Sequence, residues 1–210
     1  MNTILHESHI LGPIPLYSMY LCTDVILIEA QENYHKRSMR NRFDLLTANG
    51  VQTLTIPLVK GKNNQQKIKD VLISYDEQWM DKHLHSIRSA YGKSPYFEYY
   101  FDQLSDLFTQ RFEYLFDFNL SVLHFTLLSL KIHKDIQFTK TYEHSYHQVI
   151  DVRNTDWQNP ESVGRIYPQV WNQKFDFIPN LSILDLLFCT GPEAIFYLQS
   201  LDQNRTNQTF

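Results

Sequence analysis

The sequence predicts an α/β fold, with a mainly parallel or mixed sheet, a βαβ-like N-terminal unit, a β-hairpin and a helical central region. Three observations support it: an almost unbroken apolar run at residues 25–30, the turn signal Asn49-Gly50, and apolar residues at helical spacing within residues 77–133. With 210 residues, 43% of them apolar, the chain can form one domain with a sizeable core. We expect a single domain over residues 1–201 and a frayed C-terminal tail over residues 202–210.

The first thirty residues contain the predicted βαβ-like unit. Residues 3–9 can be extended, and the prolines at 13 and 15 stop that segment and preset the turn into a short helix at residues 16–22. The run VILIEA at residues 25–30 is rich in β-branched residues, which is typical of a strand buried on both faces of a parallel sheet. Glu29 is therefore expected at the end of a buried strand.

A hairpin is predicted around Asn49-Gly50, which separates the strand-like segments 43–48 and 51–58. Asn-Gly is the strongest short-range signal for a tight hairpin turn. The polar stretch 60–67 is expected to be a mobile loop that leads to a short strand at residues 71–74.

Three helices are predicted in the middle of the chain, because apolar side chains repeat at spacings of three and four residues. The first covers residues 78–91. Ser94-Pro95 is expected to begin the second, and Asn119 is expected to cap the third.

The C-terminal part is expected to end in two more helices. The segment LSILDLLF predicts a short one, and Thr190–Glu193 is expected to open another, through either a capping box or a proline in its first turn. Residues 134–178 show weaker periodicity and predict surface connections between short extended pieces.

Composition excludes several classes of protein. The net charge of -4 argues against a protein that holds nucleic acid over its whole surface, which needs many cations spread along one face. The N-terminus lacks the pattern of a signal peptide and no apolar run is long enough to cross a bilayer, so we expect a cytoplasmic protein without a transmembrane segment. Cys22 and Cys189 lie in apolar contexts and are expected to be inert, reduced core thiols.

Familiar motifs of cofactor and metal chemistry are missing from the sequence. It contains no GxSxG, GxGxxG or Walker motif, and its six scattered glycines cannot form a phosphate-binding loop. His83 and His85 have the spacing nearest to that of metal ligands, but on a helix they point in nearly opposite directions. The sequence therefore predicts neither a cofactor nor a metal site.

The stretch HKRSMRNR concentrates positive charge, with four Lys and Arg residues within the seven positions 36–42. Whether this segment is extended or helical, several of these cations share a face and repel one another. Water, the carboxylates of Glu29, Glu32 and Asp44, or a bound anion could compensate them. Because arginine's planar fork suits carboxylate and phosphate, Lys36, Arg40 and Arg42 are candidate anion-binding residues.

Several segments together resemble the WbqC-like family of bacterial proteins, in the version found in Bacteroidetes. The resemblance covers roughly residues 8–200 and rests on ENYHKRSMRNR, on ANG followed by LTIPL and KG, on ISYDEQWMDKHLHSIRSAYGKSPYFEYY, on FEYLFDFN and on FIPNLSILDLLFCTGPEAIFYL. The chain departs from the family at its start, where SHILGPIPLYSMYL replaces the common QP.Y.P..GYF element. Many members also have Trp at the positions of Met39 and Leu84.

The resemblance implies a transferase role in surface polysaccharide assembly of the O-antigen type, with glycine transfer to a sugar as one form of it. The matching motifs add candidate substrate-binding residues to the cations above: Arg37, Asn41, Lys82, Tyr91 and Asn180. The family motifs carry no established roles onto these positions.

We therefore expect a transferase whose partner is a small anionic substrate: a sugar phosphate, a nucleotide sugar or an amino-acyl donor. His83 is the first candidate general acid or base, because its unperturbed pKa lies near operating pH, and Glu29 is the second. The alternative is a non-catalytic module that binds an anion or glycan, or that scaffolds a partner. The oligomeric state does not follow from the sequence.

Overall fold

The computed structural model describes residues 2–60, 66–157 and 166–206. Within these ranges the chain forms a parallel sheet, an antiparallel hairpin and a helical region, which confirms the predicted α/β class. The loop expected to be mobile lies mostly outside the described residues, since its central positions 61–65 are among those left out.

Four strands form the parallel sheet in the order β5-β2-β1-β6. They are β1 (Thr3–Glu7), β2 (Val25–Glu29), β5 (Asp135–Phe138) and β6 (Val149–Asp151). Helix α1 (Ile14–Leu21) connects β1 to β2, which confirms the βαβ-like opening. Because β1 and β2 are the two central strands and pair in register, their last residues are neighbours at the carboxyl edge of the sheet.

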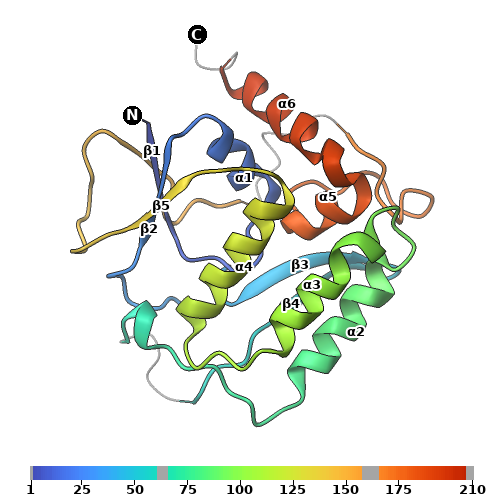
Figure 1. Cartoon of the computed structure of the whole chain (residues 1–210), viewed down its shortest axis with the longest axis horizontal. Coiled ribbons are helices and arrows are strands. Elements are labelled where there is room, and N and C mark those ends of the chain that lie inside the picture. Colours follow the sequence, from blue (N-terminus) through green and yellow to red (C-terminus); the bar gives the residue numbers. More distant parts are fainter. Residues whose placement is uncertain (1, 61–65, 158–165, 207–210) are drawn as a thin grey trace.

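The predicted hairpin forms from β3 (Arg42–Thr47) and β4 (Gly50–Thr55), with Thr47 opposite Gly50. In Figure 1 it lies across the molecule from the parallel sheet, beside the helices of the central region. A short 3-10 helix, η2 (Ile68–Asp70), follows. The strand predicted at residues 71–74 is wrong, because Leu72 and Ile73 make only isolated bridges.

The helical central region consists of α2 (Trp79–Tyr91), α3 (Phe97–Thr109) and α4 (Leu115–Ser129). Two predicted helix starts are wrong. Ser94 does not cap α3, because its hydroxyl donates to the carbonyl of Tyr91 instead. Asn119 lies inside α4, where its buried amide donates to the carbonyl of Arg40 at 2.8 Å and so joins the helix to the basic segment.

The C-terminal part contains α5 (Ile183–Thr190), the 3-10 helix η4 (Gly191–Glu193) and α6 (Ala194–Thr206). The sequence offered a capping box or a first-turn proline as the start of this helix. Thr190 makes no side-chain cap and a proline occupies the first turn of η4, so the proline start is the one that forms. Helix α6 continues past Leu201, where the frayed tail was expected to begin.

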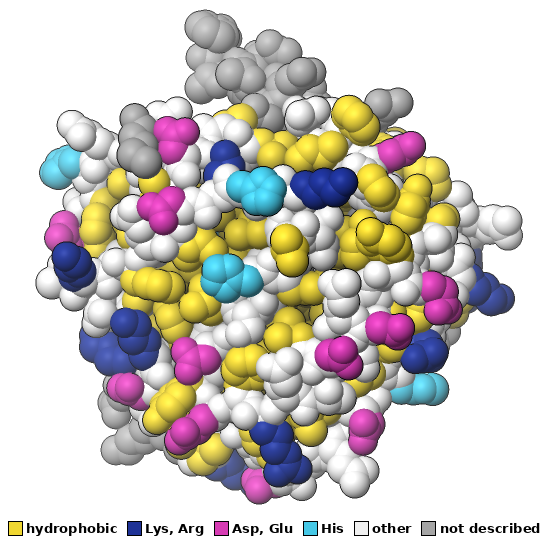
Figure 2. Space-filling model, in the orientation of Figure 1, with side chains coloured by type: hydrophobic (Ala, Val, Ile, Leu, Met, Phe, Trp, Pro, Cys, Tyr) yellow, Lys and Arg dark blue, Asp and Glu magenta, His cyan; other side chains and the backbone are white. Residues whose placement is uncertain are grey.

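The surface differs from expectation at one cysteine. Cys189 is buried, but Cys22 is exposed, so the expectation of a core thiol is wrong for Cys22. On the face that Figure 2 shows, Lys and Arg side chains are dispersed among Asp and Glu. Among the described residues, no helix combines the length and apolar character that a bilayer crossing requires.

Gly191 and Gly50 provide a matched test of packing, because both have positive φ, +53° and +96°. A Cβ at Gly191 would overlap the ring of Tyr96, whereas a Cβ at Gly50 would meet open space. We expect Gly191→Ala to lower the free energy of unfolding by about 2–5 kcal/mol and Gly50→Ala by only about 1–2 kcal/mol. Urea unfolding followed by circular dichroism measures both, and equal losses would mean that Tyr96 moves aside without cost.

Candidate functional site

A pocket of about 450 Å³ opens beyond the carboxyl end of β1. Its wall comes from residues 35–40, from the start of the hairpin and from residues 154–157, with Glu7 and His9 at the sheet side. Ligands of α/β proteins commonly bind at this edge of a parallel sheet. The pocket is therefore the first place to look for the predicted anion site.

Four of the predicted cations line this pocket: Lys36, Arg37, Arg40 and Arg42. Lys36 and Arg37 are exposed, and Arg42, the first residue of β3, is half-buried. The sequence left open whether residues 36–42 are extended or helical. Residues 36–41 form turns and bends, and Arg42 alone belongs to a strand. The Ser38 hydroxyl closes the turn by donating to the carbonyl of His35 at 2.7 Å.

Arg40 differs from the other three because only 2% of the residue is exposed and its guanidinium faces carboxylates of the protein. It donates from Nε to Glu32 Oε1 at 2.7 Å and from Nη2 to Glu32 Oε2 at 2.5 Å, and Nη2 lies 3.6 Å from Glu7 Oε1. Burial opposes the charge, but the fork to Glu32 and the nearby Glu7 raise the pKa of Arg40 above its ordinary value. The guanidinium of Arg40 is thus already paired with carboxylates of the protein itself.

Glu7 and His9 form a buried pair against the pocket. The sequence did not single them out as candidate site residues. His9 Nε2 lies 3.7 Å from Glu7 Oε1, and the backbone N–H of Asn154 donates to Glu7 at 3.2 Å. Burial alone would raise the pKa of Glu7, but the hydrogen bond and charge of His9 and the charge of Arg40 hold it well below its usual range. Glu7 is therefore an ionised partner for His9.

His6, which precedes Glu7 on β1, makes packing contacts and does not pair with the Glu7 carboxylate. Burial lowers the pKa of His6 to about 4, so the ring is neutral at physiological pH. Its Nδ1 contacts the carbonyl of Glu7 at 2.6 Å and its Nε2 contacts the hydroxyl of Tyr20 at 2.9 Å. Both nitrogens have partners, so His6 is part of the packing.

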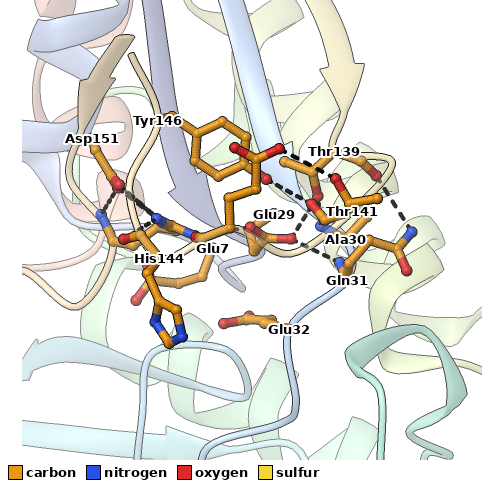
Figure 3. Close-up of polar contacts among 12 residues, drawn as sticks. Glu7, Glu29, Ala30, Gln31, Glu32, Thr139, Thr141, His144, Tyr146 and Asp151 are labelled. Carbon is orange, nitrogen blue, oxygen red and sulfur yellow. Dashed lines mark hydrogen bonds and ion pairs between the residues drawn. The ribbon is translucent and has the colours of Figure 1, made fainter.

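Glu29 ends β2 as predicted and is completely buried. Figure 3 shows its carboxylate within a set of polar contacts at the edge of the sheet. It accepts hydrogen bonds from the Thr139 hydroxyl and the Gln31 backbone N–H on Oε1, and from Arg153 on Oε2 at 3.0 Å. The described pocket wall does not include Glu29.

His83, the other predicted acid or base, lies elsewhere. Its Nδ1 contacts the carbonyl of Trp79 at 2.7 Å, and its ring packs against the rings of Trp79 and Phe43. Burial lowers its pKa. Within the described residues, the pocket wall does not include this histidine.

The remaining predicted residues are not brought to the pocket wall that the structure describes. Asn41 accepts from the hydroxyl of Tyr34 at 2.8 Å and is buried, and the buried Tyr91 hydroxyl accepts from the backbone N–H of Leu46. Lys82 is exposed and lies 3.6 Å from Glu77. Asn180, with a φ of +60°, lies just before α5.

Arg153 is a further residue that the sequence reasoning missed, within a stretch predicted to be a surface connection. It joins Glu29 to Asp151 through ion pairs of 3.0 and 2.7 Å. Its neighbour Asn154 lines the pocket. Among the described residues, no group of three or more His, Cys, Asp or Glu side chains is arranged to hold a metal ion.

Comparison with known proteins agrees with the resemblance seen in the sequence. The model of the WbqC-like protein family matches residues 8–156 and 150–197. The chain belongs to this family. An uncharacterized protein of Mycobacterium tuberculosis, Rv1507c, is 27% identical to this WbqC-like protein over 220 residues, which cover 87% of this chain and 91% of the other. No solved structure matches the chain.

The buried pair of Arg40 and Glu32 can be compared with the exposed pair of Lys82 and Glu77. We expect Arg40→Ala to lower the free energy of unfolding by about 3–5 kcal/mol, because Glu32 would be left buried without a partner. Lys82→Ala should lower it by less than about 1 kcal/mol, because that pair is in solvent. Urea unfolding tests both variants, and a small loss for Arg40→Ala would show that Glu32 finds another partner or a proton.

Proposed function

We propose that this WbqC-like protein is a transferase that takes an anionic sugar derivative or activated donor into the pocket, as a step in assembling a surface polysaccharide of the O-antigen type. The donor classes are sugar phosphates, nucleotide sugars and amino-acyl donors, glycine among the groups transferred. The polysaccharide setting, like the narrower link to the Bacteroidetes version of the family and the cytoplasmic location, rests on the sequence resemblance and composition.

One observation carries the chemical part of this proposal: the buried pair of Glu7 and His9 meets the pocket whose wall includes Lys36, Arg37 and Arg42. Cations bind the phosphate or carboxylate of a substrate and stabilise charge that develops in the transition state. A histidine beside an ionised carboxylate can accept a proton from an attacking hydroxyl or amine, because the carboxylate stabilises the imidazolium. Groups suited to anion binding and a group suited to proton transfer thus line the same pocket.

The pair of Glu7 and His9 replaces His83 and Glu29 as the proposed acid or base. His83 is packed among aromatic rings, and the Glu29 carboxylate is occupied by three donors. Arg40 is assigned to Glu32 for the same reason, which leaves Lys36, Arg37 and Arg42 for the substrate anion. Asn41, Lys82, Tyr91 and Asn180 have no part in this version of the site.

The anion site can be tested with inorganic pyrophosphate and a panel of sugar phosphates and nucleotide sugars, by thermal shift and calorimetry. A ligand at a hundred times its dissociation constant stabilises the fold by about 2.7 kcal/mol, which such assays detect. We expect Lys36→Ala, Arg37→Ala and Arg42→Ala each to weaken binding about tenfold or more, since each removes a charge-assisted contact. Lys82→Ala is the matched control. A triple variant that binds as tightly as Lys82→Ala would place the anion elsewhere.

The catalytic role of His9 can be separated from anion binding once a donor is found. We expect His9→Gln to lower turnover by about 10²–10⁴-fold while its affinity for pyrophosphate changes little, because general acid–base catalysis contributes a factor of that size. His83→Gln is the control, with rates corrected for the folded fraction. Unchanged turnover in His9→Gln would exclude His9 as the acid or base. A wild type that binds donors but transfers nothing to any acceptor would favour the non-catalytic module.

A further inference from the structure

Two glutamates end neighbouring strands at the carboxyl edge of the sheet. Glu7 and Glu29 are register partners on the parallel strands β1 and β2, so their side chains leave the same face of the sheet. Both residues are buried, with 5% and 0% of their surface exposed. Neighbouring carboxylates in a buried site repel each other unless hydrogen-bond donors and cations compensate their charge. The groups around each glutamate supply that compensation.

Arg153 compensates Glu29. The five N–H donors of its guanidinium all have acceptors: Glu29, Asp151 and the backbone carbonyls of Glu143 and His144. The rings of Tyr142 and Tyr146 lie 5.4 and 5.0 Å from its Cζ. In Figure 3, Glu29, His144, Tyr146 and Asp151 lie close together. Arg153 is thus held in one position and has no donor left for a ligand.

Asn154, the residue after Arg153, connects the anchored arginine to Glu7. The backbone N–H of Asn154 lies 3.2 and 3.3 Å from the two carboxylate oxygens of Glu7. Asn154 has a φ of +59°, a left-handed conformation that asparagine tolerates better than most residues. On the other side of Arg153, the Val152 N–H donates to the carbonyl of Leu5. The anchored arginine therefore determines where the Asn154 N–H points.

We propose that Arg153 and Glu29 form a positioning pair that keeps Glu7 charged and oriented toward His9. Neither member of the pair lines the pocket among the described residues, so both act through Glu7. Several charged groups face Glu7 or its neighbours. Arg40 donates to Glu32 and also lies 3.6 Å from Glu7, Arg153 pairs with Glu29, and His9 Nε2 lies 3.7 Å from Glu7. The significance of His9 for transfer rests on the proposed function, but the positioning itself does not.

The proposal gives a measurable property, the pH at which the Glu7 carboxyl takes up a proton. Without Arg153, Glu29 would be an uncompensated neighbour, and Glu7 would lose the N–H of Asn154. Both changes disfavour the ionised form of Glu7. The protonation midpoint of Glu7 should then rise from far below the normal range toward the ordinary glutamate value of about 4.3.

The test follows the Glu7 side-chain carboxyl carbon by NMR during a pH titration of the full chain, in parallel with urea unfolding. We expect the midpoint to rise in Arg153→Gln and to rise less in Arg153→Lys, which keeps the charge but not the fork. The double variant E29Q/R153Q should recover part of the low midpoint, because it removes the unpaired carboxylate. Lys82→Ala is the control, since Lys82 lies 3.6 Å from the exposed Glu77 and takes no part in these contacts.

A midpoint that stays at the wild-type value in every Arg153 variant that folds would overturn the proposal, even if those variants unfold more easily. Arg153 would then be an ordinary structural ion pair. No ligand is needed for this measurement. Its failure is therefore distinct from failure of the proposed function, which would appear as a lack of anion binding or transfer.

Discussion

Burial of three glutamate carboxylates at one edge of a parallel sheet is the constraint on which this structure depends. Glu7, Glu29 and Glu32 are each at most 5% exposed. A buried carboxylate is unstable without hydrogen-bond donors and positive charge. Two arginines supply that charge, and each brings its own chain segment to the edge of the sheet. The pocket walls are therefore held by the same interactions that neutralise the glutamates.

This arrangement separates two uses of positive charge that look alike in the sequence. All four cations line the pocket, but Arg40 is buried against Glu32, whereas Lys36 and Arg37 are exposed and Arg42 is half-buried. The amide of Asn119 holds the backbone of the same segment through the carbonyl of Arg40. A rigid inner arginine thus gives the outer cations a defined place.

The sequence predicted those parts of the fold that local chemistry determines. The apolar run before Glu29, the Asn49-Gly50 turn and the helical spacing of apolar residues each gave the correct element. The predicted helix caps failed because a polar side chain near a helix start has several possible partners. Ser94 bonds back to the preceding helix, and Asn119 is used for a tertiary contact.

The candidate site was only partly predictable. The charge cluster at residues 36–42 indicated a pocket with cations, but nothing in its spacing shows which arginine turns inward. Glu7 and His9 had one signal, their place as polar residues in the predicted extended segment 3–9, and that signal does not indicate a pair at a pocket. Arg153 had none, because its contact with Glu29 joins positions 124 residues apart in the chain.

That separation has a consequence for how the protein is made. β1 and β2 are synthesised early, yet both outer strands of their sheet and Arg153 follow only after residue 134. Contacts between distant positions form slowly, because a long loop must close before they are gained. During synthesis, the glutamates at the ends of β1 and β2 therefore leave the ribosome before Arg153 and the outer strands. A chain that ends before residue 135 would lack both outer strands, so β1 and β2 would have unpaired edges exposed to aggregation.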